Sequence, residues 1–284
     1  MDITSLQNPR VKHIVKLRDD KRTRKEDGLM LVEGYDEIQL AVSAGHTPQT
    51  ILRSPALAPG ASAGASVDYA AEKTGGSAQR EPEFASNHLA VSASESLTVS
   101  RPVFEKISYR DNPDGWLAIF PIPKTKLDEI KLSHTPLVIV AESIEKPGNL
   151  GAILRTADAA RVDAVLVCDP RVDAWNPNVV RASRGAVFSV PVVECDNAAA
   201  LDWLKQGRMR VAAASPSADE IYSNADLSQP VAIAVGAEDE GLSDFWMSKA
   251  DVKVKIPLMG KVNSLNVSVS TALIVYEALR QRGR

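Results

Sequence analysis

Residues 137–156 read LVIVAESIEKPGNLGAILRT, an apolar run followed by a helical pattern. Leu137–Ala141 is almost continuously apolar, which is typical of a parallel strand buried on both faces. Leu150–Ala160 then repeats apolar residues at helical spacing. The same alternation continues, with apolar runs at Ala164–Cys168, Val211–Ala214 and Val231–Val235 and helical patterns at Asn176–Arg184, Ala198–Gln206, Ser243–Ala250 and Asn266–Gln281. It predicts an α/β domain over residues 135–284, with a mainly parallel sheet and helices on both faces.

The first half of the chain has shorter elements and predicts a smaller α/β domain over residues 1–122. The expected strands are Gly28–Val32, Thr50–Leu52 and Trp116–Phe120, and the expected helices are Asp36–Ser43 and Pro102–Ile107. Segment 55–78 is rich in Ala, Gly, Ser and Pro. It lacks the apolar surface that ordering requires, so it is predicted to be a mobile loop. Pro121-Ile122-Pro123 stiffens the chain and begins a predicted linker over residues 123–134.

The composition places this chain of 284 residues among globular proteins, since 44% of it is hydrophobic and 24% is charged. No apolar run approaches the ~20 residues that span a bilayer, which predicts no membrane partner. The two cysteines, Cys168 and Cys195, form neither a disulfide framework nor a zinc pattern, and they favour a reducing cytoplasm. A net charge of −3 by itself argues against a nucleic-acid partner.

The charge is unevenly distributed, however, because basic residues gather between residues 10 and 25. They are Arg10, Lys12, Lys16, Arg18, Lys21, Arg22, Arg24 and Lys25, against only Asp19 and Asp20. Apolar residues at partly helical spacing in the same stretch predict one short amphipathic helix with a basic outer face. Two interpretations stay open at this point, a contact surface for RNA and an ordinary solvated helix.

Several common catalytic sites are missing from the sequence. It contains no Walker-type phosphate loop, no Gly-x-Gly-x-x-Gly motif and no Gly-x-Ser-x-Gly nucleophile motif. All four histidines (His13, His46, His88 and His134) precede residue 135, which excludes His-dependent nucleophilic catalysis and a His-ligated metal in the α/β domain. We therefore expect no metal, and chemistry that uses Arg, Glu, Ser, Asn and backbone groups.

Three loops are each expected to follow a strand, where α/β folds place their ligand sites. The first, around residues 145–156, has Asn149 at an expected helix start, Gly151 for a close backbone approach, and Arg155 one turn later. Arg155 could clamp a phosphate or a ribose with its forked donors. A helix cap followed by a surface arginine is the alternative interpretation.

The second and third loops are also polar. Residues 236–242 read GAEDEGL, and the Glu238 carboxylate could bind hydroxyl groups or a cation, or could belong to an ordinary turn. Residues 256–268 read IPLMGKVNSLNVS, an irregular segment that places Ser264 and Asn266 at the start of the last helix. A helix cap needs only one of these two polar side chains. The second one, beside so apolar a helix, favours a functional role for the pair.

Together, the three loops resemble the motifs of the SpoU-type (TrmH-like) branch of the SPOUT RNA methyltransferases. The first loop matches Asn-x-Gly-x-x-x-Arg and the second matches Gly-x-Glu-x-x-Gly-Leu. The third matches Ile-Pro-x-x-Gly-x-x-x-Ser-Leu-Asn-Val-Ser. Any one motif is weak, but three in this order across the whole α/β half are specific. One departure lies beside the first motif, where Lys146 stands at a position that is often acidic in the family.

The resemblance implies methylation of an RNA ribose 2′-hydroxyl by S-adenosylmethionine. It also implies a C-terminal trefoil knot and a homodimer packed through the knot region. The expected cofactor-binding residues are Gly236, Ile256, Leu258, Gly260 and Leu265. The expected catalytic group contains Arg155 on the ribose or phosphate, with Asn149, Glu238, Ser264 and Asn266 orienting it or the hydroxyl.

The first half is similar to the substrate-binding domains that precede such catalytic domains and resemble kink-turn-binding ribosomal proteins. Residues 5–12 (SLQNPRVK), 32–34 (VEG) and 111–115 (DNPDG) carry this likeness. RNA then becomes the expected partner despite the net charge, because phosphate attraction depends on local patches. The expected contacts are Arg10, Lys12, Lys21, Arg22 and Arg24. The two-domain layout favours ribosomal RNA. A transfer RNA methyltransferase, a non-catalytic RNA-binding module and a small-molecule enzyme are the alternatives.

Overall fold

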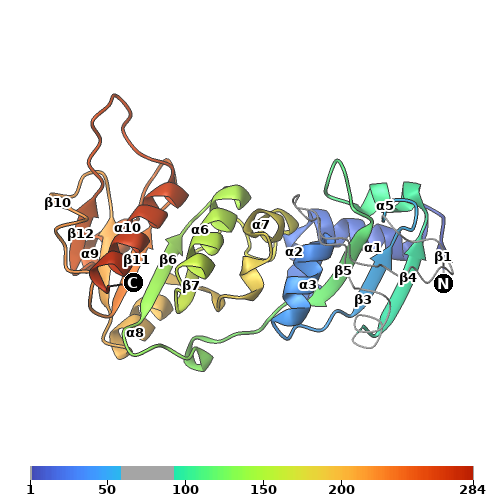
Figure 1. The fold of residues 1–284 in the computed structure, drawn as a ribbon, viewed down its shortest axis with the longest axis horizontal. Helices are drawn as coiled ribbons and strands as arrows, with labels where there is room; N and C mark the ends of the chain where they lie inside the picture. The colour runs from blue at the N-terminus through green and yellow to red at the C-terminus, as the bar shows by residue number, and fades with distance from the viewer. Residues whose placement is uncertain (1, 59–92, 284) are drawn as a thin grey trace, which may run out of the picture. The chain divides into compact units, whose positions relative to one another are not determined.

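The computed structural model describes residues 2–58 and 93–283, which form two structural units (Figure 1). Residues 1–35 and 47–121 make up the first unit, and residues 36–46 and 122–284 make up the second. The helix α3 (Tyr35–Ser43) begins at the boundary between them. Residues 59–78 of the predicted mobile loop lie outside the described ranges. None of the described helices has the length and apolar character needed to cross a membrane.

The first unit is built on a five-stranded mixed sheet in the order β1-β4-β3-β5-β2. Its strands are β1 (Asp2–Ile3), β2 (Leu29–Glu33), β3 (Thr50–Arg53), β4 (Glu95–Val99) and β5 (Trp116–Pro121). Helices α1 (Pro9–Asp19), α2 (Lys21–Asp27) and α5 (Arg101–Ile107) accompany it. One core joins the sheet to α1 and α5 through residues such as Leu17, Leu52 and Phe104. The strands and helices predicted for this half are confirmed, with small changes of boundary.

The basic stretch forms two helices where the sequence predicted one. The break is at Asp20, whose extended backbone (φ −117°, ψ 115°) ends α1. Its carboxylate accepts hydrogen bonds from the backbone N–H groups of Arg22 and Thr23 and so caps α2. A capping aspartate therefore redirects the chain in the middle of the basic run.

The second unit contains a seven-stranded sheet in which every neighbouring pair is parallel, in the order β10-β12-β9-β11-β6-β7-β8. The strands are β6 (Leu137–Glu142), β7 (Ala164–Cys168), β8 (Val192–Cys195), β9 (Arg210–Ala214), β10 (Glu220–Ile221), β11 (Val231–Val235) and β12 (Val252–Lys255). β6, β7 and β11 are buried along their whole lengths. This burial confirms the prediction made from their continuous apolar runs.

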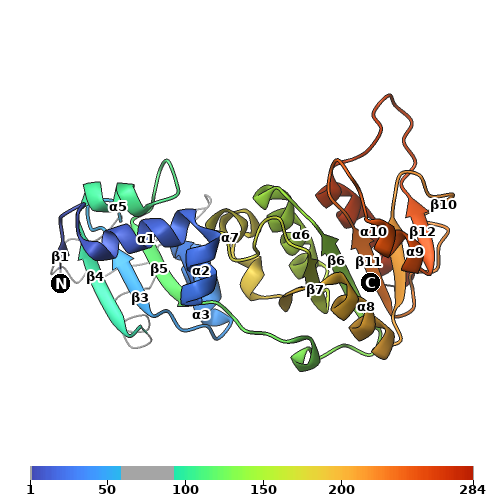
Figure 2. The ribbon, with the colours of Figure 1, turned by 180° about the vertical axis from the view of Figure 1, so that it is seen from behind.

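Helices cover both faces of this sheet, as Figures 1 and 2 show. They are α6 (Pro147–Ala159), α7 (Pro177–Ser183), α8 (Asn197–Gln206), α9 (Asp244–Lys249) and α10 (Val267–Gln281), with short 3₁₀ turns at Leu127–Glu129 and Ala186–Phe188. One core cluster joins β6 and β7 to Leu204 of α8 and Trp246 of α9. Leu127, Ile130 and Leu132 of the predicted linker also pack against this cluster.

Candidate active site at the carboxyl edge of the parallel sheet

The three polar loops lie at one edge of the sheet because they follow β6, β11 and β12, which are all parallel. β11 pairs directly with β6, and β9 separates β11 from β12. Parallel strands have their carboxyl ends at the same edge, which is where open α/β sheets bind ligands. The topology thus brings the first loop (residues 145–156) together with the second and third loops (residues 236–242 and 256–268).

A cleft of about 600 Å³ opens between the second and third loops. Most of the predicted cofactor-binding and catalytic residues of these loops line it, namely Gly236, Glu238, Ile256, Leu258, Ser264 and Leu265. Gly260 is not among the described residues that line the cleft. Ser215 and Ser217, in the loop after β9, also contribute, and their hydroxyl oxygens lie 2.9 Å apart. Sequence reasoning missed them, although the polar turn after an apolar run was the available signal.

The second loop folds tightly back on itself at Gly236. A Cβ atom at this position would lie 2.1 Å from the carbonyl oxygen of Gly241, so only glycine fits. The Gly241 N–H donates to the Ala237 carbonyl over 2.9 Å, which closes the turn. Gly151 in α6 has a comparable role, because a Cβ there would lie 2.4 Å from the Cβ of Ala182 in α7. The close backbone approach predicted at Gly151 is confirmed.

Asn149 and Asn266 meet directly, but Asn149 is not the helix cap that the sequence predicted. α6 begins at Pro147 with Lys146 as its cap residue, so Asn149 lies inside the first turn. Its Oδ1 accepts a hydrogen bond from Nδ2 of Asn266 over 3.0 Å. Its own Nδ2 is buried and has no hydrogen-bond partner within the described residues. A buried donor of this kind is costly unless a ligand completes it.

Asn266 has a second role as the cap of α10. Its Oδ1 accepts from the backbone N–H of Ser268 over 3.0 Å and from that of Val269 over 3.4 Å. One side chain therefore starts α10 through its oxygen and holds the first loop through its nitrogen.

Glu238 pairs with Lys146, the residue that departs from the family pattern. The hydrogen bond and the negative charge of Glu238 raise the pKa of the Lys146 ammonium group. Oε1 of Glu238 is buried and lacks a partner in the described part of the chain. A second link between the same loops runs through Arg171, which pairs with both Glu145 and Glu240. Sequence reasoning missed Arg171, because nothing in its local pattern indicates a bridge between two distant loops.

Arg155 lies exposed in a different depression, a groove of about 660 Å³ between α6, α7 and α10. Ser183 and Arg184 line one side of this groove, and Val269, Leu273 and Tyr276 of α10 line the other. The first turn of α10 separates it from the cleft, since Ser268 and Val269 line the groove whereas Val267 and Ser270 line the cleft.

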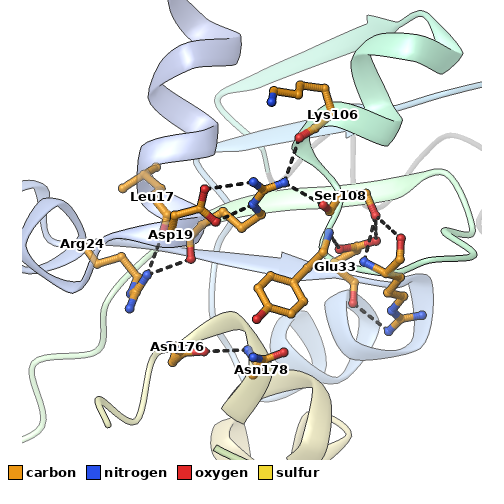
Figure 3. Close-up of polar contacts among 11 residues, drawn as sticks. Leu17, Asp19, Arg24, Glu33, Lys106, Ser108, Asn176 and Asn178 are labelled. Atoms are coloured by element: carbon orange, nitrogen blue, oxygen red, sulfur yellow. Dashed lines mark hydrogen bonds and ion pairs between the residues drawn. The ribbon is translucent and has the colours of Figure 1, made fainter. Parts of the chain in front are cut away.

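The predicted RNA contacts in the first unit fall into two groups. Lys12, Lys21, Arg10 and Arg22 are all exposed. Arg10 pairs with Glu95, and Arg22 pairs with Glu26. Arg24 is only 2% exposed, and its Nη1 donates to the carbonyl oxygens of Leu17 and Arg18, as Figure 3 shows. Its guanidinium satisfies the end of α1, so the predicted contact between Arg24 and RNA does not fit the structure.

Both units match known families. Residues 136–276 match the SpoU rRNA methylase family, and residues 8–118 match the MRM3-like substrate binding domain. A solved RNA 2′-O ribose methyltransferase is 39% identical, with all of both chains covered and a TM-score of 0.79. A solved AdoMet-bound rRNA methyltransferase from Sinorhizobium meliloti is 26% identical, with 99% of this chain and 97% of that chain covered and a TM-score of 0.82.

A curated relative agrees with these matches. A protein of Staphylococcus haemolyticus described as a TrmH family tRNA/rRNA methyltransferase is 41% identical over 146 residues, which is 51% of this chain. The chain spans 59% of the length of that relative. These likenesses agree with the convergence of the three loops, and the chain therefore belongs to the SpoU rRNA methylase family.

Proposed function

We propose that this protein transfers a methyl group from S-adenosylmethionine to a ribose 2′-hydroxyl of RNA. The observation that carries the proposal is the convergence of the three loops, where Asn266 bonds to Asn149 and the second and third loops line one cleft. Family membership supports the reaction type.

The cleft suits S-adenosylmethionine in size and chemistry. Its volume of about 600 Å³ lies within the range of small-molecule sites, roughly 300–1,000 Å³. Ile256, Leu258 and Leu265 offer apolar surface for an adenine ring. The loop between β12 and α10 is neither helix nor strand, so its backbone N–H and C=O groups can bind polar atoms of the ligand. Glu238 Oε1, a buried acceptor with no partner among the described residues, can meet a cationic group.

The residues of this chain orient the hydroxyl and stabilise its oxygen. S-adenosylmethionine supplies, when bound, a methyl group on a sulfonium centre. Asn149 offers the ribose its Nδ2, which has no partner in the described ranges, and Ser264 lines the cleft where the hydroxyl would lie. The forked guanidinium donors of Arg155 bind the adjacent phosphate or the ribose oxygen. Orientation of this kind is worth several kcal/mol of the ~8–23 kcal/mol that enzymes supply.

We propose ribosomal RNA as the substrate, with the exposed Lys12 and Lys21 of the first unit among its contacts. The match of residues 8–118 to a substrate-binding domain supports a two-domain RNA enzyme. The solved relative from Sinorhizobium meliloti is an rRNA methyltransferase, which favours ribosomal over transfer RNA. The proposed location is the cytoplasm, which the free cysteines Cys168 and Cys195 favour. The proposal also includes a first domain like the kink-turn-binding ribosomal proteins. It includes a trefoil knot in the C-terminal part of the second domain.

We also propose that the protein is a homodimer that packs through α10. Val269, Leu273 and Tyr276 form an exposed apolar stripe at spacings of four and three residues, on one helix face. The stripe lines the same groove as Arg155, so a second copy would cover it beside the catalytic arginine. Light scattering should give a dimer mass for the native protein and a monomer mass for Leu273→Glu. A native monomer would overturn the dimer.

Calorimetry with S-adenosylmethionine and a map of ribose methylation test the main proposal. The native protein should bind the cofactor, and one 2′-O-methyl mark in ribosomal RNA should disappear when the gene is deleted and return with the native gene. If the mark lost on deletion lies in transfer RNA, the substrate is transfer RNA and not ribosomal RNA. Cofactor binding with every mark retained would favour a non-catalytic module, and no binding at millimolar ligand would end the methyltransferase proposal.

A further inference from the structure

Glu142 is a buried carboxylate at the end of β6, and both of its oxygens accept hydrogen bonds. The residue is 3% exposed. Its Oε1 accepts from Ser243 Oγ over 2.6 Å and from Asn197 Nδ2 over 2.8 Å. Its Oε2 accepts from the Ser243 backbone N–H over 2.8 Å. Burial of a carboxylate is costly unless such bonds compensate for lost water, so the site is built around this group.

The partner of Glu142 stands at the end of the second loop. Ser243 directly follows Leu242 and precedes α9, the position where a serine hydroxyl commonly caps its own helix. Here the hydroxyl points to Glu142 instead, and within the described structure it caps none of the N–H groups of α9. The side chain thus ties the loop to β6, 101 residues earlier in the chain, at the expense of a local cap.

Asn197 extends this connection to the buried Trp246 in the first turn of α9. Its Nδ2 donates to Glu142 and also to Asp169 Oδ2 over 2.5 Å. Its Oδ1 accepts from Nε1 of Trp246 over 2.6 Å, and Trp246 is fully buried in α9. The start of α9 is therefore held at two points. Ser243 bonds directly to Glu142, and Trp246 is connected to Glu142 through Asn197.

We propose that Glu142 is a positioning residue for the cofactor site, because its carboxylate holds the second loop in the conformation that binds S-adenosylmethionine. Leu242, Asp244 and Met247 line the cleft, and Glu142 binds the residue between the first two. The first residue of the second loop follows β11 directly and stays fixed by that strand. Loss of the hydrogen bonds between Ser243 and Glu142 therefore gives freedom only to the Ser243 end of the loop. The inference rests on the proposed function and adds a residue that all three sequence motifs leave out.

The test compares S-adenosylmethionine affinity by calorimetry on the full chain, in three variants of this network and one control variant. In Glu142→Gln, either orientation of the amide sets its NH₂ against the N–H of Ser243 or the NH₂ of Asn197. The Kd should rise at least tenfold. Ser243→Ala loses one donor and should raise the Kd about twofold to fivefold. Ser243→Thr keeps the hydroxyl and the N–H, so its Kd should match that of the native protein.

Glu33→Gln is the matched control for a general loss of stability. Glu33 is 8% exposed in the first unit, where it accepts from Ser108 Oγ and from the Tyr109 N–H, each over 2.6 Å (Figure 3). The Glu33→Gln variant should lower the free energy of unfolding in urea as Glu142→Gln does. Its Kd for S-adenosylmethionine should be unchanged.

The inference is overturned if folded Glu142→Gln binds within twofold of the native protein, or if Glu33→Gln weakens binding equally. If Glu142→Gln does not fold, Ser243→Ala and Ser243→Thr decide, and equal Kd values for these two overturn it. A native protein that fails to bind overturns the proposed function itself, whereas normal binding by both native protein and Glu142→Gln removes only the role of Glu142.

Discussion

Asn266 donates a hydrogen bond from its Nδ2 to Oδ1 of Asn149 over 3.0 Å and so joins the first turns of α10 and α6, 117 residues apart. The same side chain caps α10 through its Oδ1. The helix that follows the third loop is thereby placed relative to the first loop by one amide group. This arrangement makes the two roles of Asn266 separable by mutation.

Asn266→Asp should keep the cap and lose the link. Aspartate caps helices as well as asparagine, so the free energy of unfolding should change by less than about 0.5 kcal/mol. Its carboxylate cannot donate to Asn149, and methyl transfer should fall at least tenfold. Asn266→Ala loses both functions and should also cost about 1 kcal/mol of stability. Urea unfolding and a methyl-transfer assay separate the two effects, and full activity in Asn266→Asp would contradict the role of the link.

Arg155→Ala should retain the cofactor and lose the reaction. Arg155 lies outside the set of residues that line the cleft, so the Kd for S-adenosylmethionine should stay within twofold. Loss of one charged donor to a developing oxyanion costs about 10²–10³ in rate, which sets the expected decrease. Lys249→Ala, which removes an exposed charge from the end of α9, is the control. Turnover by Arg155→Ala at the native rate would remove Arg155 from the proposed mechanism.

The double variant Lys12→Glu and Lys21→Glu should weaken RNA binding without a change in cofactor affinity. Both side chains are exposed, and removal of each lysine–phosphate ion pair should lower the slope of log Kd against log salt by about 0.7. Arg24→Ala is the contrasting variant, because it removes the donor to the buried carbonyl of Leu17 and to the partly buried carbonyl of Arg18. It should cost about 1–3 kcal/mol of stability and leave RNA affinity unchanged in the folded protein. If the double variant binds RNA as the native protein does, α1 and α2 do not contact RNA and are ordinary solvated helices.

Cys195 should react with iodoacetamide before Cys168 as the pH rises from 7 to 9. The two sulfur atoms lie 4.0 Å apart at paired positions of β7 and β8. The hydrogen bond between the thiols lowers the pKa of Cys195 and, together with burial, raises the pKa of Cys168. Cys195 therefore forms its thiolate, the reactive species, at the lower pH. Peptide mass mapping after timed alkylation would show the order, and equal rates at both sites would contradict it.

The strands that the sequence predicted best are those buried on both faces. β7, β11 and the first five residues of β6 are uninterrupted apolar runs, because helices cover both sides of the sheet at its centre. In the second unit, β8, β10 and β12 were missed. β8 and β10 are edge strands, and β10 has only two residues. β12 reads VKVK with one buried residue, so its local signal is too weak to separate from a loop.

The sequence by itself determined the alternation of strands and helices, the three loops and the residue types available to them. Those features depend on local periodicity and on glycine and asparagine at particular turns, which a short window contains. The tertiary structure alone decided that Arg24 is buried, that Arg155 faces a groove apart from the cleft, and that Glu142 holds Ser243. Each of these outcomes depends on which distant backbone or side chain lies opposite a polar group. That choice is made by the packing of the whole unit, because a buried polar atom must find its partner wherever the fold places one.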